Sequence, residues 1–161
     1  MTAYRFPGAL PFNDTPRPGR LIVFCGTDGA GKSSLVQATA DLLTAGGHSA
    51  ETAAQPSPFV RSFPPFADYR SGVGRERYSY RAISMLVMAD KLQHSDHDLT
   101  PRLRAGHHLV LDRYVFSGLV RLAMYGDPNE AWFADACALL PRPDLTVLVT
   151  AHPDVLRDRL A

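Results

Sequence analysis

The sequence predicts an α/β fold in three layers, with helices on both faces of a mainly parallel sheet. Short, unbroken apolar runs at 21–25, 109–111 and 145–149 are typical of strands that are buried on both faces. Segments with helical spacing of apolar residues alternate with these runs, and that alternation favours helices packed on both sides of a parallel sheet. With 161 residues and 45% hydrophobic composition, the chain has enough apolar material for one such domain.

The N-terminal residues do not follow this pattern. Residues 1–19 contain four prolines, Pro7, Pro11, Pro16 and Pro18. Their spacing excludes a helix and discourages a paired strand, because proline lacks a backbone N–H group and has a fixed φ angle. We therefore expect a Pro-rich extended arm at 1–19 and a single domain over 20–161.

The first half of the domain contains one clear strand–helix unit. The strand at 21–25 leads into a helix that ends at Gly46 and Gly47. The apolar residues expected to form its buried face are Leu35, Val36, Ala38, Leu42 and Leu43. Residues 48–54 form a weaker second strand, and the Pro-rich, aromatic segment that follows predicts a long functional loop.

The second half repeats the alternation of helices and strands. A helix is predicted over 75–94, with Ala82, Ile83, Leu86, Val87 and Ala89 toward the core. The strand at 109–111 follows, and then a helix over 132–140. A buried strand at 145–149 and a last helix from Pro153 complete the prediction.

The most informative motif is a glycine-rich loop between the first strand and the first helix. Residues 26–33 read Gly-Thr-Asp-Gly-Ala-Gly-Lys-Ser, which matches the G-x-x-x-x-G-K-[ST] phosphate-binding pattern. Such a loop turns its N–H groups around phosphates, its lysine reaches the outer phosphates and its hydroxyl suits Mg²⁺. A nucleoside triphosphate with Mg²⁺ is the ligand that this phosphate cradle predicts. The alternative is a glycine-rich turn that binds nothing.

Asp112 directly follows the strand at 109–111. Ligands bind at the carboxyl ends of strands in open α/β sheets. A carboxylate at that place, in a chain that has a phosphate cradle, can hold the magnesium ion or its water. Ser33 and Asp112 are therefore the predicted metal residues.

Three segments of the chain resemble the thymidylate kinase family. They are 28–34, which reads DGAGKSS, 112–118, which reads DRYVFSG, and 139–145, which reads LLPRPDL. A partial fourth, MADKLQH at 88–94, is similar to the family's Ala-x-Arg helix segment. Over 20–161 the resemblance implies a P-loop kinase fold and transfer of the ATP γ-phosphoryl to the 5′-phosphate of a deoxynucleotide, usually dTMP. It also implies a homodimer in the cytoplasm.

The resemblance assigns roles to residues of this chain. ATP would be bound by Gly26, Thr27, Asp28, Gly29, Ala30, Gly31, Lys32, Ser33 and Ser34. Lys32, Arg113 and Asp28 would be catalytic, because phosphoryl transfer depends on positioning and on neutralising charge. Arg113 would hold the acceptor phosphate with its planar fork of N–H groups, and Ser117 would lie beside the acceptor. The alternative for Arg113 is a structural ion pair, and for Asp28 a turn or cap residue.

The positions that depart from the family pattern concern the acceptor. Val87 stands where the family has a phenylalanine that stacks on thymine, and Lys91 stands where an arginine reads the base. After Ser117 and Gly118 the family has an aromatic residue that closes on the sugar, whereas this chain has Leu-Val-Arg at 119–121, and Arg121 is the candidate substrate residue there. The second strand of the family normally ends in Arg-Glu-Pro or similar, whereas this chain reads Ala-Gln-Pro at 54–56, so Gln55 replaces the acidic residue. Arg61 is a candidate for the phosphate contact that is missing here.

Two other functions remain open on the sequence. The first is a deoxynucleoside kinase, which would phosphorylate a sugar hydroxyl with the help of a general base. The amide of Gln55 does not provide that base, but the carboxylate of Asp28 or Asp112 could act instead. A nucleotide-binding module with little catalysis is the second. The resemblance predicts an arginine-bearing lid after Arg157 and Arg159, but the chain ends at Ala161. We therefore expect the C-terminal part of the family fold to be absent.

Composition argues against several partners. Lysine and arginine total 17 against 16 acidic residues, so no global charge favours nucleic acid or an anionic membrane. No apolar stretch is long enough to span a bilayer, and no leader is recognised, which favours the cytoplasm. The two cysteines, Cys25 and Cys137, are expected to be small core residues. His94, Asp96, His97 and Asp98 are a weak metal candidate, because such clusters are more often solvated surface.

Overall fold

The computed structural model describes residues 9–125 and 131–160 and contains one parallel sheet. Its strands are β1 (Leu21–Gly26), β2 (Ala50–Ala54), β3 (His108–Asp112) and β4 (Leu145–Val149). The strand order is β2-β3-β1-β4, and every neighbouring pair is parallel. The predicted α/β fold with a mainly parallel sheet is therefore confirmed.

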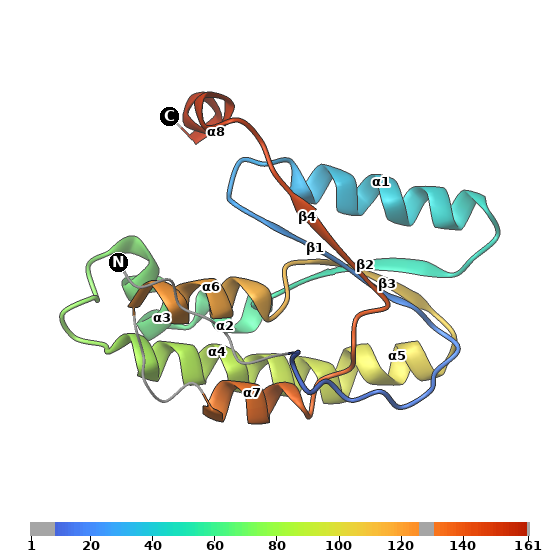
Figure 1. Ribbon diagram of the computed structural model, residues 1–161, viewed down its shortest axis with the longest axis horizontal. Helices are drawn as coiled ribbons and strands as arrows, with labels where there is room; N and C mark the ends of the chain where they lie inside the picture. Colours follow the sequence, from blue (N-terminus) through green and yellow to red (C-terminus); the bar gives the residue numbers. More distant parts are fainter. Residues whose placement is uncertain (1–8, 126–130, 161) are drawn as a thin grey trace.

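Helices cover both faces of the sheet, as Figure 1 shows. The helix α1 (Lys32–Ala45) covers one face. On the other side lie α4 (Tyr80–His94), the π-helical turn η1 (Ser95–Leu99), α5 (Thr100–Arg104), α6 (Phe116–Tyr125) and α7 (Ala131–Cys137). The short helices α2 (Pro58–Ser62) and α3 (Pro64–Ser71) pack beside α4, and α8 (Pro153–Leu160) follows β4. None of the described helices is both long and apolar enough to cross a membrane.

Alternate residues of the central strands divide the core into two layers. Leu21, Leu109 and Leu111 point to the larger cluster, which also contains Met88 of α4 and Leu122 of α6. In the opposite layer, Phe24 and Val110 pack against Val36 and Ala40 of α1. The period of two along each strand places successive side chains on opposite faces. Cys25 and Cys137 are both buried and free, as expected.

Two predicted buried surfaces are wrong. The strand at 145–149 is at the edge of the sheet, and Leu145 and Leu148 are 52% and 68% exposed. The helices pack mainly on β1, β2 and β3, so the faces of this edge strand are largely uncovered and its apolar run does not mean burial on both faces. In α1 the buried apolar residues are Val36 and Ala40, four positions apart, whereas Leu42 is 74% exposed. The helix therefore presents a narrower apolar face to the sheet than the spacing suggested.

The long loop predicted after the second strand is also wrong. It contains α2 and α3, and each helix begins with a proline in its first turn, where no intrahelical N–H bond is required. The next helix, α4, begins at Tyr80 rather than at 75, because the Ser79 hydroxyl accepts a hydrogen bond from Ala82 N at 3.2 Å and caps it. In α4, Met88 is buried, whereas Ala82 and Ala89, predicted to face the core, are exposed.

The described part of the arm, 9–19, lies against the domain. Leu10 is buried in the larger core cluster. Phe12 stacks on Tyr114 with ring centroids 6.0 Å apart, and Asn13 forms a bridge to Pro141. Arg17 pairs with Asp144 at 2.9 Å. The arm thus reaches the segment that follows β3.

Candidate functional site

The phosphate cradle, residues 26–33, lies between β1 and α1, as predicted. Gly26 and Gly31 have φ angles of 144° and 95°, which L side chains rarely adopt. A Cβ atom on Gly26 would lie 2.2 Å from the Val149 carbonyl oxygen, so only glycine fits there. Lys32 is buried, and its Nζ donates to the Thr27 carbonyl at 2.6 Å. Burial and the nearby Arg113 lower the pKa of Lys32.

Ser33 and Asp112, the predicted metal residues, are in direct contact. The Ser33 hydroxyl donates to Asp112 Oδ2 at 2.7 Å. The second carboxylate oxygen, Oδ1, is buried and has no hydrogen-bond partner among the described residues. A hydroxyl and a carboxylate oxygen with an unused acceptor are oxygen ligands of the kind that Mg²⁺ prefers. These two residues therefore fit a magnesium ion.

Arg113 has an unusual backbone conformation directly after β3. Its φ angle of 69° is in the left-handed region, which is uncommon for residues other than glycine and often marks functional sites. The guanidinium pairs with Asp28 and also donates to the Ser117 hydroxyl at 3.0 Å. Partial burial alone would raise the pKa of Asp28, but Arg113, with Lys32 and Arg70, lowers it. Arg113 is thus held at the mouth of the cradle.

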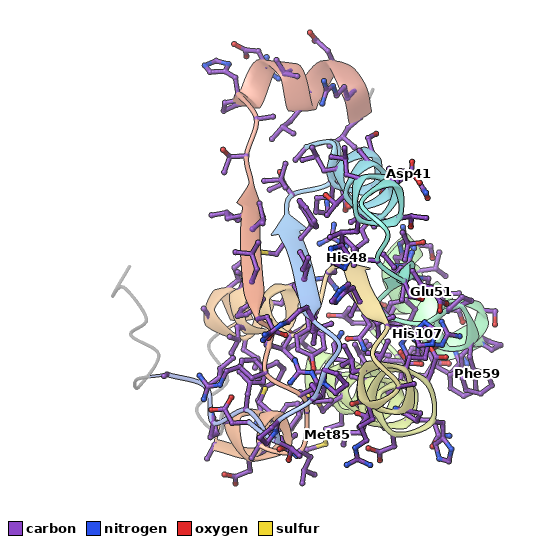
Figure 2. All side chains as sticks on the ribbon, turned by 90° about the vertical axis from the view of Figure 1, so that its right-hand side faces the viewer. Asp41, His48, Glu51, Phe59, Met85 and His107 are labelled. Carbon is purple, nitrogen blue, oxygen red and sulfur yellow. The ribbon has the colours of Figure 1, made fainter. Side chains whose placement is uncertain are left out.

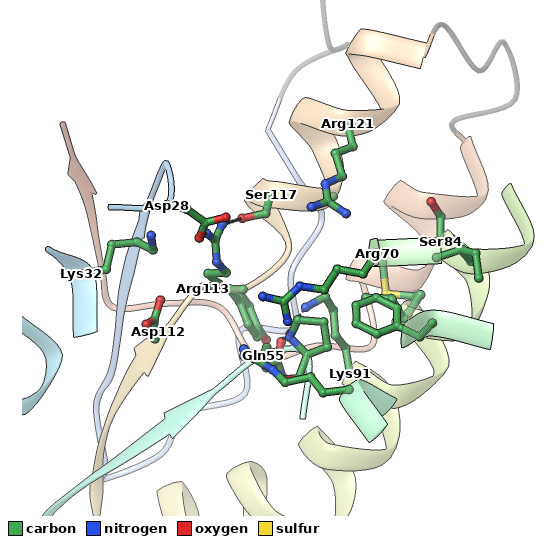
Figure 3. Close-up of a pocket in the computed structure, with 18 of the residues that line it drawn as sticks. Asp28, Lys32, Gln55, Arg70, Ser84, Lys91, Asp112, Arg113, Ser117 and Arg121 are labelled. Atoms are coloured by element: carbon green, nitrogen blue, oxygen red, sulfur yellow. Dashed lines mark hydrogen bonds and ion pairs between the residues drawn. The ribbon is translucent and has the colours of Figure 1, made fainter. Parts of the chain in front are cut away.

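All these side chains face one cavity of about 590 Å³. Figure 3 shows Lys32, Asp112, Asp28 and Arg113 on one side of it. The predicted site residues that line the cavity are Asp28, Gly29, Gly31, Lys32, Ser33, Ser34, Arg61, Val87, Lys91, Asp112, Arg113, Ser117 and Arg121. Gly26, Thr27 and Ala30 do not line it, although Thr27 holds the Lys32 ammonium. Residues predicted from distant parts of the sequence are therefore brought to one place.

The floor of the cavity contains a buried polar pair, Lys91 on α4 and Gln55 after β2. Lys91 is 3% exposed, and its Nζ donates to Gln55 Oε1 at 3.1 Å. Burial lowers the pKa of Lys91 to about 7. The adjacent Asp90 does not pair with Lys91, because its carboxylate accepts hydrogen bonds from both the backbone and the hydroxyl of Ser57.

Several lining residues were not predicted from the sequence. They are Gln55, Pro56, Phe66, Arg70, Tyr80, Ile83, Ser84, Met88, Tyr114, Gly118, Phe133 and Arg159. Gln55 had a usable signal, its position at the end of a strand. Arg70 had none, because it lies in the segment interpreted as a loop. Arg159 of α8 donates to the Gly29 carbonyl of the cradle at 2.9 Å, a contact across 130 positions of sequence.

The aromatic residues of α2 and α3 behave differently from one another. Phe66 is buried and lines the cavity. Phe59 is 78% exposed and points outward, as Figure 2 shows. Only part of this segment therefore contributes to the site.

The weak metal candidate at 94–98 forms an ion-pair network instead. His94 pairs with Asp98 at 3.0 Å, and Asp98 also pairs with Arg102 at 2.7 Å. Over residues 9–125 and 131–160, no group of three or more His, Cys, Asp or Glu residues is placed to hold a metal ion. His94, Asp98 and Arg102 therefore link α4, η1 and α5 by ion pairs.

The parallel sheet, the strand–cradle–helix unit and the acidic strand end together define a P-loop α/β protein. The model of the family "Thymidylate kinase" matches residues 24–161. The chain therefore belongs to the thymidylate kinase family.

Individual relatives agree with this assignment. A probable thymidylate kinase from Caldivirga maquilingensis is 27% identical over 137 residues, which are 84% of this chain and 65% of that protein. A thymidylate kinase from Xanthomonas campestris is 31% identical over 135 residues, 84% of this chain and 57% of that protein. A solved thymidylate kinase from Candida albicans matches the fold with a TM-score of 0.66 at 23% identity, covering 91% of this chain and 69% of that one. The chain thus spans less than two thirds of the length of these two curated relatives.

Proposed function

We propose that the protein is an ATP-dependent phosphotransferase that transfers the γ-phosphoryl of ATP to the 5′-phosphate of a deoxynucleoside monophosphate, with dTMP as the first candidate. One observation carries this proposal: the phosphate cradle and the Arg113–Asp28 pair open into the same cavity. A donor and an acceptor, each with phosphate groups, can therefore meet between them. Membership of the thymidylate kinase family and the names of the relatives support dTMP as acceptor.

The cradle would bind the donor. Its N–H groups and the Lys32 ammonium offset the charge of the β- and γ-phosphates. Ser33 and Asp112 would hold Mg²⁺, which supplies further charge neutralisation when it is bound. The contact between Lys32 and the Thr27 carbonyl keeps the ammonium at the mouth of the cradle until phosphate replaces that carbonyl.

Arg113 would orient the acceptor phosphate. Its guanidinium provides paired N–H donors, which match two phosphate oxygens. Arg61, Arg70 and Arg121 line the same cavity and add positive charge near the acceptor. Phosphoryl transfer between two anions requires this positioning and charge neutralisation more than covalent help from the protein.

The transfer to a phosphate rather than to a sugar hydroxyl is supported by the end of β2. A hydroxyl acceptor is helped by a base, whereas a phosphate is already ionised. Gln55 has an amide, which does not accept a proton at neutral pH, and its oxygen is bound by Lys91. The carboxylates that line the cavity, Asp28 and Asp112, are engaged by Arg113 and Ser33.

The decisive measurement is ADP formation from MgATP with dTMP, dUMP, dCMP, ribothymidine monophosphate and thymidine offered separately. Turnover with dTMP or another monophosphate, and not with thymidine, is the expected result. Turnover with thymidine would favour a deoxynucleoside kinase. ATP binding by calorimetry without turnover on any acceptor would favour a nucleotide-binding module.

Two substitutions separate the donor and acceptor roles. Arg113→Ala is expected to reduce ADP formation by about three powers of ten and to leave ATP affinity within a few fold. Lys32→Ala is expected to weaken ATP binding itself. Arg104→Ala, which changes an exposed arginine on α5, is the matched control. Equal loss of ATP affinity in the Arg113 and Lys32 variants would contradict an acceptor role for Arg113.

We also propose that the protein acts as a homodimer in the cytoplasm. Both are expected for the thymidylate kinase family, to which the chain belongs. Sedimentation velocity at several protein concentrations tests the assembly. A single monomeric species at all of them would contradict it.

A further inference from the structure

Two of the basic side chains that line the cavity have no partner within the described part of the chain. Seven basic side chains line it in all, and five of them donate to an oxygen atom. These five contacts are Lys32 with Thr27, Arg61 with Pro56, Lys91 with Gln55, Arg113 with Asp28 and Arg159 with Gly29. The other two, Arg70 of α3 and Arg121 of α6, are exposed and form no hydrogen bond or ion pair with a described residue. Their guanidinium groups are therefore available to a ligand.

Arg121 lies beyond the arginine that we assign to the acceptor phosphate. Ser117 and Arg121 are four positions apart on α6, so they share a face of the helix and are separated by about one turn, roughly 6 Å. The Ser117 hydroxyl accepts a hydrogen bond from Arg113. Arg121 is therefore about one helical turn farther along the cavity than that contact.

Arg70 reaches the same region from the opposite element. Figure 3 shows Arg70 and Arg121 extending into the cavity on the side of Arg113 that faces away from Lys32. The charge of Arg70 also contributes to the lowered pKa of Asp28, the partner of Arg113. Two unpartnered guanidinium groups from α3 and α6 therefore face the space beyond the acceptor-phosphate arginine.

This side of the cavity has more positive charge than one phosphate group requires. Four guanidinium groups line it, those of Arg61, Arg70, Arg113 and Arg121. Asp28 is the carboxylate that opposes them, because Asp112 is bound by Ser33 beside the cradle. A phosphate monoester has about two negative charges at pH 7. Like charges gathered in a concave site repel one another unless anions bind there, so the excess favours a second anionic group.

We propose that Arg70 and Arg121 form a second phosphate subsite, and that the preferred acceptor is a deoxynucleotide with a phosphate on its 3′ oxygen in addition to the 5′-phosphate. This inference rests on the proposed function, because it concerns the molecule that receives the γ-phosphoryl group. The distance of one helical turn beyond Arg113 is comparable with the separation of the 5′- and 3′-phosphates of one nucleotide. Each guanidinium offers paired N–H donors that match two phosphate oxygens.

The second phosphate leaves the chemical step unchanged. An oxygen of the 5′-phosphate forms a bond to the γ-phosphorus of ATP, and the bond from that phosphorus to the β–γ bridging oxygen breaks. ADP leaves with the bridging oxygen and its electron pair, and the product has a 5′-diphosphate and a 3′-phosphate. The 3′-phosphate serves for recognition alone. Arg70 and Arg121 are therefore residues that determine specificity and are not catalytic.

The experiment is calorimetric titration, without ATP, with dTMP, thymidine 3′,5′-bisphosphate, dTDP and thymidine. The matched ligand is dTDP, because it also has two phosphates but carries both on the 5′ oxygen. We expect the 3′,5′-bisphosphate to bind at least about tenfold more tightly than dTMP, because hydrogen bonds between charged partners are the stronger kind. With MgATP added, the 3′,5′-bisphosphate should also support ADP formation.

Substitutions test whether the two arginines cause this preference. Arg70→Gln and Arg121→Gln should each reduce the advantage of the 3′,5′-bisphosphate over dTMP at least about threefold, and leave the ratio of dTDP to dTMP affinity unchanged. Arg75→Gln removes an exposed arginine that does not line the cavity and should change neither ratio. Because all three arginines are exposed, the fold should persist, which thermal unfolding checks. Equal loss of both ratios in the Arg70 and Arg121 variants would mean that they act only through their general field, and the inference would be wrong.

The remaining outcomes separate this inference from the proposed function. If wild-type protein binds the 3′,5′-bisphosphate no more tightly than dTMP but forms ADP with dTMP, the inference is wrong and the proposed function stands. Inorganic phosphate is the other source of a second anion. If it tightens dTMP binding and the 3′,5′-bisphosphate has no advantage, the subsite binds a free ion and the inference is again wrong. If neither nucleotide binds or supports ADP formation, the proposed function fails and the inference fails with it.

Discussion

Lys91 is the residue whose charge the fold opposes most clearly. Burial lowers its pKa from 10.5 to about 7. Asp90 and Cys137 act in the opposite direction, whereas Arg61 and Arg113 add to the effect of burial. No carboxylate forms an ion pair with this ammonium among the described residues, so its main compensation is the bond to the neutral amide oxygen. A buried charge with such a partner reduces stability.

This shift predicts a pH dependence of stability with a definite sign. Between about pH 7 and 10.5 the unfolded chain holds the Lys91 proton and the folded chain does not, so the free energy of unfolding rises with pH in that window. At or below pH 7 the burial penalty is largest. Lys91→Met should therefore raise the free energy of unfolding at pH 7, and the gain should shrink by on the order of 1 kcal/mol per pH unit above it.

Urea unfolding of wild type and Lys91→Met at several pH values from 7 to 9 measures this gain. Arg104→Met, at an exposed arginine, should give a small change that does not vary with pH. A pH-independent gain in Lys91→Met would mean that the lysine keeps its ordinary proton affinity in the fold.

At this scale the sequence predicted which residues meet, but not how their hydrogen bonds are distributed. The cradle pattern and the family motifs led to Lys32, Asp112 and Arg113. The free amide N–H of Gln55 has no signature in the sequence, because it depends on which neighbours already use the nearby acceptors.

The arm is the element whose place the sequence did not indicate. Phe12 contacts both Tyr114, at 6.0 Å between ring centroids, and Phe116, at 6.4 Å. These two residues follow Arg113 closely in sequence. The Tyr114 hydroxyl also donates to the Pro141 carbonyl at 3.0 Å. The arm therefore supports the segment that directly follows Arg113.

Phe12→Ala tests this support. The half-buried ring should contribute about 2 kcal/mol to the free energy of unfolding, less than the roughly 3–5 kcal/mol of a fully buried phenylalanine. Denaturant unfolding measures the change. Phe59→Ala, at a ring that is 78% exposed, is the control and should cost less than about 0.5 kcal/mol. Equal effects of the two substitutions would show that the arm does not stabilise the domain.

Two other cases show that a sequence pattern predicts the presence of a strand or helix better than it predicts what surrounds that element. The apolar run of β4 has the composition of a central strand, but the burial of its side chains depends on whether helices cover its faces. The Pro-rich segment of α2 and α3 was interpreted as a loop, yet a proline in the first turn is compatible with a helix. In both cases a residue's position within the element decides its effect.

For the whole molecule, charge is distributed very unevenly. The chain has a formal net charge of +1. The cavity, in contrast, is lined by many basic side chains, Lys32, Arg61, Arg70, Lys91, Arg113, Arg121 and Arg159, and by only two carboxylates, Asp28 and Asp112. A net charge this small gave no indication of this local concentration of basic side chains. A concave basic surface concentrates its field on an anionic ligand.

This distribution predicts that affinity depends on salt through the ligand's phosphate. The dissociation constant of dTMP should rise about tenfold between roughly 0.05 and 0.5 M NaCl, because Arg61, Arg70 and Arg121 are exposed and therefore screened. Thymidine, which has the same base and sugar without a phosphate, is the matched control and should change less than about twofold. Calorimetric titrations of both ligands along one salt series make the comparison. The same salt dependence for both would mean that the basic lining does not act on the acceptor phosphate, and binding would then have to depend on the short-range contacts of the cavity floor.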